Sequence, residues 1–201
     1  MRIGIVLYDG FDELDAIGPY EVLRNAAAGG ADCTVELVTR EPAERVTASH
    51  GLELVPQSVL DGSYDLVVVP GGGFGERAEA GAWGEIQRGG LPDALRELYA
   101  GGTAMAAVCT GGMLLSAAGI TRGRPTTTHH VALDALREAG AEVLEERVVD
   151  DGDVITSGGV TSGLDMALWL VEREWGRELA DRIAREMEHE RVGGVYLRTP
   201  T

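Results

Sequence analysis

The chain contains no lysine, only two cysteines and few aromatic residues. The first two scarcities argue against certain partners and cellular compartments. All 17 basic residues are arginine, whereas Asp and Glu number 33, so the formal charge is −16. A surface this acidic repels nucleic acid and anionic membranes, and we expect neither as a partner. The acidity itself suits solubility in a salty cytoplasm, as in a halophilic source, or reflects codon bias. Two cysteines without a framework spacing indicate a reducing compartment, so a cytoplasmic location is expected.

Other absences argue against membrane, secreted, zinc-binding and nucleotide-binding proteins. No apolar run approaches the length of a membrane span, and the apolar start, Met1–Leu7, is too short for a signal peptide and typical of a first strand. No Cys/His cluster has the spacing of a zinc site, so we expect no metal. The loop Pro70–Gly75 lacks both the Gly-x-Gly-x-x-Gly spacing and a Walker lysine, which disfavours a nucleotide cofactor. A length of 201 residues predicts one domain, 1–201.

Strand and helix patterns alternate along the whole chain, which predicts an α/β sandwich: a mostly parallel sheet with helices on both faces. Because proline suits the first turn of a helix, Pro19 predicts a helix that begins near Gly18, with Asp12–Ile17 as the preceding loop. In such folds ligands bind beyond the carboxyl ends of the strands. The loops at 9–18, 70–75 and 109–112 each follow a strand, so we expect them to converge on one crevice.

Cys109 stands where the apolar strand 103–108 turns into a helical pattern at 113–118. A strand that ends on a reactive side chain and turns sharply into a helix is a nucleophile elbow. The helix start directs N–H groups and partial positive charge at the side chain, which predicts a thiolate. A buried cysteine that packs as a small hydrophobe is the alternative, but the glycines after Cys109 argue against it. Cys33 begins a strand, and we expect it in the core.

Two further parts of a catalytic site can be assigned to residues. The backbone N–H groups of Gly72 and Gly73, with that of Thr110, are suited to an oxyanion hole, although a plain tight turn is the alternative. Asp15 is flanked by apolar residues and precedes Gly18. That setting predicts partial burial, which raises a carboxyl pKa and permits proton exchange near neutrality.

The histidines and the last glycine-rich turn carry weaker signals. His129 is placed to reach the pocket or to hold its loop by hydrogen bonds, and the second role is favoured. His50 and His189 have no supporting context. The small residues of 157–163 suit a pocket wall, so Val160 and Thr161 are candidate substrate-binding residues. Asp165 is expected to cap or orient its neighbours.

These residues resemble the ThiJ/PfpI superfamily, relatives of the class I glutamine amidotransferase domain. Four segments carry the resemblance in order: Asp15–Val22 (DAIGPYEV), Val69–Gly73 (VPGGG), Val108–Gly112 (VCTGG), and Thr127–His129 with Gly158–Asp165. The combination most resembles the branch that contains isonitrile (isocyanide) hydratases and sensor-like domains fused to AraC-type regulators.

The resemblance implies a flavodoxin-like sandwich, usually a homodimer, that acts on a small molecule without a cofactor. It implies Cys109 as the nucleophile, Asp15 as the acid/base beside its sulfur, and Thr110 next to the thiol. The backbone of Gly72 and Thr110 would form the oxyanion pocket. No DNA-binding domain follows in this sequence, so we expect no fused regulator.

Departures from other branches point toward one reaction. Thr110 stands where the protease-like branch carries histidine, which lowers the protease and amidase interpretations. The Asp15-x-x-Gly-Pro pattern argues against the glyoxalase-like branch, whereas the stretch 188–196 departs from the hydratases themselves. We expect hydration of an isonitrile to an N-substituted formamide. The alternatives are hydration of 2-oxoaldehydes through a hemithioacetal on Cys109, a non-catalytic redox sensor in which Cys109 becomes a sulfinate, and, least favoured, a binding protein with a degenerate site.

Overall fold

A computed structural model describes residues 1–198, within which eight strands form one sheet in the order β12-β10-β11-β7-β6-β1-β2-β5. Neighbouring strands run parallel except β10 and β11. The strands of this sheet are β1 (Arg2–Val6), β2 (Thr34–Thr39), β5 (Ser58–Val59), β6 (Leu66–Val69), β7 (Ala104–Val108), β10 (Val148–Asp150), β11 (Val154–Ser157) and β12 (Val195–Leu197). The central strands β6 and β7 are apolar throughout because helices cover them on both faces.

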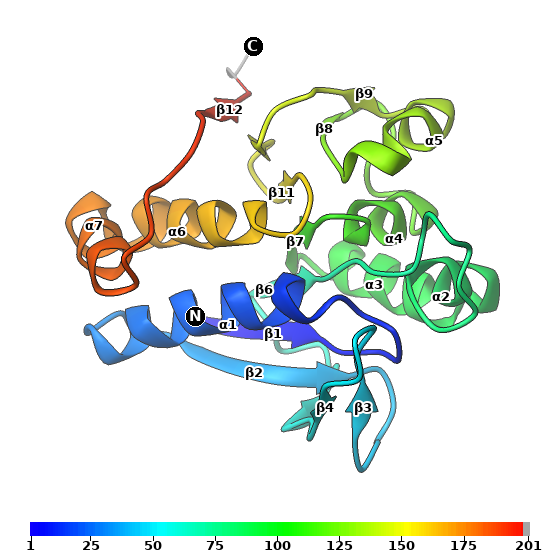
Figure 1. Ribbon diagram of the computed structural model, residues 1–201, viewed down its shortest axis with the longest axis horizontal. Coiled ribbons are helices and arrows are strands. Elements are labelled where there is room, and N and C mark those ends of the chain that lie inside the picture. Colours follow the sequence, from blue (N-terminus) through cyan, green and yellow to red (C-terminus); the bar gives the residue numbers. More distant parts are fainter. Residues whose placement is uncertain (199–201) are drawn as a thin grey trace.

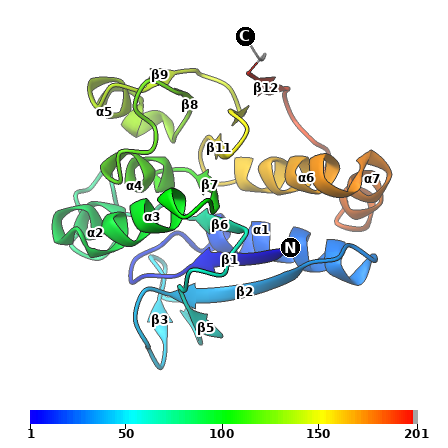
Figure 2. The same ribbon diagram turned by 180° about the vertical axis from the view of Figure 1, so that it is seen from behind.

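The helices form two layers around the sheet. They are α1 (Glu13–Ala28), α2 (Ala82–Arg88), α3 (Gly90–Ala100), α4 (Gly111–Ala117), α5 (Leu133–Glu138), α6 (Ser162–Trp175) and α7 (Arg177–Glu186). The group α1, α6 and α7 packs together on one face and the group α2, α3 and α4 on the other (Figures 1 and 2). This arrangement confirms the predicted three-layer, flavodoxin-like α/β fold. None of the helices in the described part of the chain is both long and apolar enough to cross a bilayer.

Two small sheets lie outside the main one. The strands β3 (Val46–Thr47) and β4 (Glu53–Leu54) pair antiparallel as a hairpin. The second small sheet contains β8 (Pro125–Thr126). This strand pairs with β9 (Glu142–Val143) and not with the main sheet, and a 3₁₀ turn and α5 connect the two.

The first helix begins earlier than the sequence predicted. The Asp12 side chain accepts a hydrogen bond from the Leu14 N–H at 3.1 Å, and this N-cap starts α1 at Glu13. Pro19 therefore lies inside the helix, where packing against α6 overrides its unfavourable propensity: the Pro19 Cδ is 3.6 Å from the position of a Cβ at Gly163. Consequently Asp15 sits in the first turn of a helix and not on a loop.

Gly111 marks the closest approach of α4 to β6. A Cβ at this position would lie 2.1 Å from the carbonyl oxygen of Val69 and 2.9 Å from that of Pro70. We expect Gly111→Ala to lower the free energy of unfolding by about 3 kcal/mol or more, because neither backbone atom can withdraw without disturbing the sheet. Urea unfolding measures the difference. Gly62→Ala is the matched control, since nothing lies within 4 Å of its Cβ position, and equal midpoints for the two variants would contradict the expectation.

Candidate active site

Cys109 occupies a strained turn between β7 and α4. Its φ is 57°, a left-handed conformation that costs a non-glycine residue about 1–2 kcal/mol. Hydrogen bonds hold it there: its N–H donates to the carbonyl oxygens of Ser157 (3.2 Å) and Gly158 (3.0 Å), and its own carbonyl accepts from the Thr128 hydroxyl at 2.7 Å. The geometry confirms the predicted elbow, and neighbouring segments impose it.

The thiol of Cys109 is nearly buried, with 6% of the residue exposed. Burial, followed by the charge of Asp15, raises its pKa to about 12, while backbone N–H groups of Thr110 and Val160 oppose the rise by donating to the sulfur. The expected resting thiolate is therefore wrong. The two N–H groups do favour the thiolate, but desolvation outweighs them because the thiol is nearly buried.

Asp15 is fully buried in the first turn of α1. Its Oδ2 accepts a hydrogen bond from the Gly71 N–H at 2.9 Å, whereas Oδ1 has no partner among residues 1–198. Burial, and then the charge of Asp12, raise the pKa of this carboxyl to about 8 against the opposing hydrogen bond from Gly71. The sequence predicted this direction. At neutral pH the group is chiefly a neutral acid.

Asp15 and Cys109 titrate as a coupled pair, because the charge of each acts on the other. At neutral pH the pair keeps both protons, and the first one leaves near pH 8. Loss of that proton leaves a single proton to be shared between sulfur and oxygen. One of the two resulting arrangements is a thiolate beside a carboxylic acid.

The glycine loop plays a different part from the one predicted. The Gly71 N–H is bonded to Asp15, and the Gly72 N–H donates to the Thr110 hydroxyl at 2.9 Å, so Gly72 offers no free donor for an oxyanion. Gly72 is required for another reason. Its φ is 127°, and a Cβ there would lie 2.5 Å from the Gly10 carbonyl oxygen. The donors that face the sulfur belong to Thr110 and Val160 instead.

Val160 and Thr161, both predicted to bind substrate, contact different parts of the structure. Val160 has a φ of 38°, which turns its N–H toward the sulfur. Thr161 is exposed, and its hydroxyl accepts a hydrogen bond from Arg147 at 3.2 Å. The structure therefore brings Val160 to the thiol and engages Thr161 elsewhere.

His129 both holds its own loop and forms part of the wall beside the sulfur. Its Nδ1 accepts a hydrogen bond from the Val131 N–H at 3.3 Å, and its ring lies against His130 with centroids 4.1 Å apart. The ring also covers Gly159, where a Cβ would lie 2.2 Å from the imidazole Cδ2. Burial lowers the pKa of His129, so the ring is neutral at neutral pH.

Asp165 and Cys33 lie outside this site. Asp165 binds the Nε of Arg147 (2.5 Å), the Nε2 of His189 (3.0 Å) and the Val192 N–H (3.3 Å), which is the orienting role that the sequence predicted. His189 thus has a partner that no sequence signal indicated. Cys33 packs against the core, as the sequence predicted, but its side chain is only partly buried.

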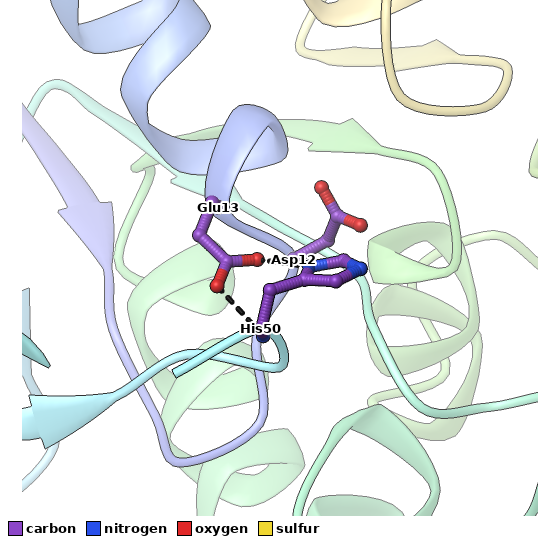
Figure 3. Close-up of side chains that lie close together, drawn as sticks. All are labelled: Asp12, Glu13 and His50. Carbon is purple, nitrogen blue, oxygen red and sulfur yellow. Dashed lines mark hydrogen bonds and ion pairs between the residues drawn. The ribbon is translucent and has the colours of Figure 1, made fainter. Parts of the chain in front are cut away.

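Asp12, Glu13 and His50 form a second cluster at the start of α1 (Figure 3). Their ligand atoms lie within 4.8 Å of one another, and one imidazole with two carboxylates could hold a divalent transition metal. Glu13 already accepts from the His50 N–H (2.7 Å) and contacts its Nδ1 (2.6 Å). Burial opposes ionisation of Glu13, but the His50 and Ser49 bonds prevail and lower its pKa to about 2. The described contacts make this cluster a clamp between α1 and the β3–β4 hairpin.

Sequence reasoning missed the groups that position the pair. The carbonyls of Ser157 and Gly158 and the Thr128 hydroxyl fix Cys109, and the Gly71 N–H fixes Asp15. None has a local signature. Only the topology indicated them, since all lie at the carboxyl ends of adjacent strands β6, β7 and β11 or in loops beside them.

Comparison with known proteins agrees with this geometry. The profile of the DJ-1/PfpI family matches residues 1–173. Isonitrile hydratase from Pseudomonas putida is 34% identical over 191 residues, which cover 94% of this chain and 78% of that protein. Protein DJ-1alpha from Drosophila melanogaster is 31% identical over 193 residues, 91% of this chain and 82% of that one. The crystal structure of a ThiJ/PfpI family protein from Pseudomonas syringae superposes with a TM-score of 0.84 at 26% identity, covering 94% of this chain and 75% of that one. The chain belongs to the DJ-1/PfpI family.

Proposed function

We propose that this protein is a cysteine-dependent hydratase that converts an isonitrile into an N-substituted formamide. The observation that carries the proposal is the buried Cys109–Asp15 pair, in which a sulfur nucleophile lies beside a carboxyl whose pKa is raised to about 8. The carbon of an isonitrile must accept both a nucleophile and a proton, and the pair can supply both. Likeness to an isonitrile hydratase over 94% of the chain supports the substrate class.

The reaction begins with the pair in its one-proton form. The Cys109 thiolate attacks the terminal carbon of R–N≡C and forms an S–C bond, while the Asp15 acid gives its proton to the same carbon. The product is a thioimidate, S–CH=N–R, beside an ionised Asp15. The unpartnered Oδ1 of Asp15 is the atom that can hold the transferable proton, because Oδ2 is engaged by Gly71.

Water completes the cycle. It adds to the thioimidate carbon, with one of its protons passing to Asp15 and the other to nitrogen. The S–C bond breaks as the C=O bond forms, which releases R–NH–CHO and restores the thiolate and the neutral acid. The N–H groups of Thr110 and Val160 stabilise the sulfur anion that departs, and each well-placed donor of this kind contributes about 3 kcal/mol.

The redox-sensor alternative is weakened by the same electrostatics. Peroxide reacts with thiolates, and sensor cysteines have lowered pKa values and exposed sulfurs. Burial and Asp15 raise the pKa of Cys109 to about 12. The resting thiol is therefore a poor target for peroxide at neutral pH.

Parallel assays with an aryl isocyanide and with methylglyoxal test the reaction. We expect the N-aryl formamide to appear in proportion to isocyanide consumed, with no lactate formed from methylglyoxal, as measured by liquid chromatography and mass spectrometry. Cys33→Ser should leave the rate unchanged, since Cys33 lies outside the site. Lactate formation with an inert isocyanide would instead favour hydration of 2-oxoaldehydes.

A further inference from the structure

A surface cleft of about 740 Å³ lies beside the glycine loop, whose Gly71 N–H holds Asp15. Gly72 and Gly73 form one of its walls, and the Gly72 N–H is bonded to the residue that follows the nucleophile. The opposite wall comes from the 9–12 segment and from the β3–β4 hairpin, which the Glu13–His50 contact clamps in place (Figure 3). The cleft is therefore one backbone segment away from the residue that follows the nucleophile.

The charges on the wall of this cleft are predominantly negative. Asp9, Asp12 and Glu76 line it, and its one basic residue, His50, is paired with the carboxylate of Glu13 at 2.6 Å. The wall includes no arginine among residues 1–198.

Two arginines close in sequence to the lining residues have other partners. Arg77, adjacent in sequence to Glu76, lies over the ring of Trp83 at 5.0 Å, and Arg45 of the hairpin pairs with Glu53 at 2.8 Å. Neither neutralises the acidic wall. In a chain with 17 arginines, this leaves a cavity beside the nucleophile without a compensating cation.

The field of these acids extends to the entrance of the sulfur site. Asp12 and Glu76 both act on the imidazole of His129, which they favour in its charged form against the effect of burial. That imidazole covers Gly159, the residue before Val160, whose N–H faces the sulfur.

We propose that this cleft binds the side group of the substrate and that Asp12 and Glu76 select side groups that carry a positive charge over those that carry a carboxylate. The inference rests on the proposed function for its reaction, but the charge preference itself belongs to the cleft. Asp12 and Glu76 act here as specificity-determining residues and take no part in the bond-making steps.

Three aryl isocyanides of matched shape test the preference: the para-(trimethylammoniomethyl), para-neopentyl and para-(carboxymethyl) compounds. We expect KM to rise in that order. At low ionic strength the KM of the cationic substrate should be at least about 10-fold lower than the KM of the anionic substrate, whereas kcat should vary little among the three. The ratio should shrink between about 0.02 M and about 0.5 M NaCl, because salt screens exposed charges. Equal KM values for the three compounds would overturn the proposal.

Charge-removing variants locate the effect. Asp12→Asn keeps a good helix cap, and Glu76→Gln changes an exposed loop residue, so both should fold. Each should reduce the ratio of KM values about 3-fold, and the double variant should nearly abolish it. Glu21→Gln, an exposed site farther along α1, is the matched control and should leave the ratio unchanged. An equal loss in that control would show a general effect of net charge and contradict a specific cleft.

Binding of the three formamide products to the Cys109→Ser protein separates this proposal from the reaction. If the parent protein turns over no isocyanide but the cationic formamide still binds most tightly to Cys109→Ser by calorimetry, the proposed hydratase activity is wrong and the proposed charge preference of the cleft is supported. If isocyanides are turned over and the three formamides bind equally, the cleft proposal fails and the hydratase stands.

Discussion

Replacing Asp15 by asparagine should abolish isonitrile turnover and at the same time make the folded protein more stable at alkaline pH. Asparagine has nearly the same shape as aspartic acid, and its Oδ1 can accept the bond that the Gly71 N–H donates to Asp15 at 2.9 Å. Its amide cannot transfer a proton to the isonitrile carbon. We expect kcat/KM to fall by roughly 10³-fold, within the range typical of a lost general acid.

The stability effect has a definite sign. Burial raises the pKa of Asp15 from an ordinary 3.8 to about 8, so the fold favours the protonated form. The stability that this group contributes is fully present below its unfolded pKa and is lost as pH rises through the folded value. If the whole shift is realised, the loss between these limits is roughly 5 kcal/mol. Asparagine stays neutral at every pH, so the variant does not lose this stability.

Chemical denaturation across pH measures this effect without any assay of activity. The difference in unfolding free energy between Asp15→Asn and the parent should grow from acid pH up to about pH 8 and then level off. Asp134→Asn, which removes an exposed carboxylate on α5, is the control and should give a difference that changes little with pH. If the difference in unfolding free energy between Asp15→Asn and the parent is the same at every pH, the carboxyl is ionised in the fold at neutral pH and the mechanism is contradicted.

The same pair sets the pH dependence of turnover. The reactive form has lost one proton, so kcat/KM should rise about tenfold per pH unit below pH 8 and reach a plateau above it. The second proton is held too tightly to leave in the usual range, because the pKa of Cys109 is raised to about 12. A profile that is flat from pH 6 to 8 would indicate a resting thiolate and restore the expectation drawn from the sequence alone.

That expectation shows where sequence reasoning stops. The elbow at Cys109 could be predicted because an apolar strand, a reactive side chain and two glycines are adjacent in the chain. The carboxyl partner could be predicted because Asp15 stands among apolar residues. The protonation state of the thiol could not, since it depends on how much water β6, β11 and α1 exclude. The helix start alone predicts a lowered pKa of the thiol, and burial reverses it.

The remaining differences have the same origin. A helix that starts at Glu13 depends on one capping bond from Asp12, which outweighs the general preference of proline for a first turn. The sequence predicted the Gly72 N–H as an oxyanion donor, but in the fold this N–H donates to the Thr110 hydroxyl at 2.9 Å. His50 gained a partner 37 positions away in sequence. In the last two cases the local pattern was sound, and a contact distant in sequence decided the outcome.

Cys109→Ser should lose isonitrile turnover more completely than Asp15→Asn, by about 10⁴-fold or more in kcat/KM. An alcohol ionises far less readily than a thiol, and a site that already raises the pKa of Cys109 to about 12 by burial and by the charge of Asp15 offers serine no route to an alkoxide. The bonds that hold the Cys109 N–H and carbonyl do not involve the sulfur, and a serine oxygen can accept from the N–H groups of Thr110 and Val160, so the fold should be retained. Cys33→Ser makes the same atomic change at a partly exposed position and serves as the matched control.

The covalent intermediate gives the variant a second readout. Rapid acid quenching of the parent enzyme with a slow aryl isocyanide should trap the thioimidate, seen as the mass of one substrate molecule added to the peptide that contains Cys109. The adduct should be absent from Cys109→Ser and should decay in the parent at the rate at which formamide appears. Turnover by the serine variant above about a tenth of the parent rate would remove sulfur from the mechanism. In that case the buried acid Asp15 would have to protonate the isonitrile carbon for direct attack by water, and the strained turn at φ 57° would require another explanation.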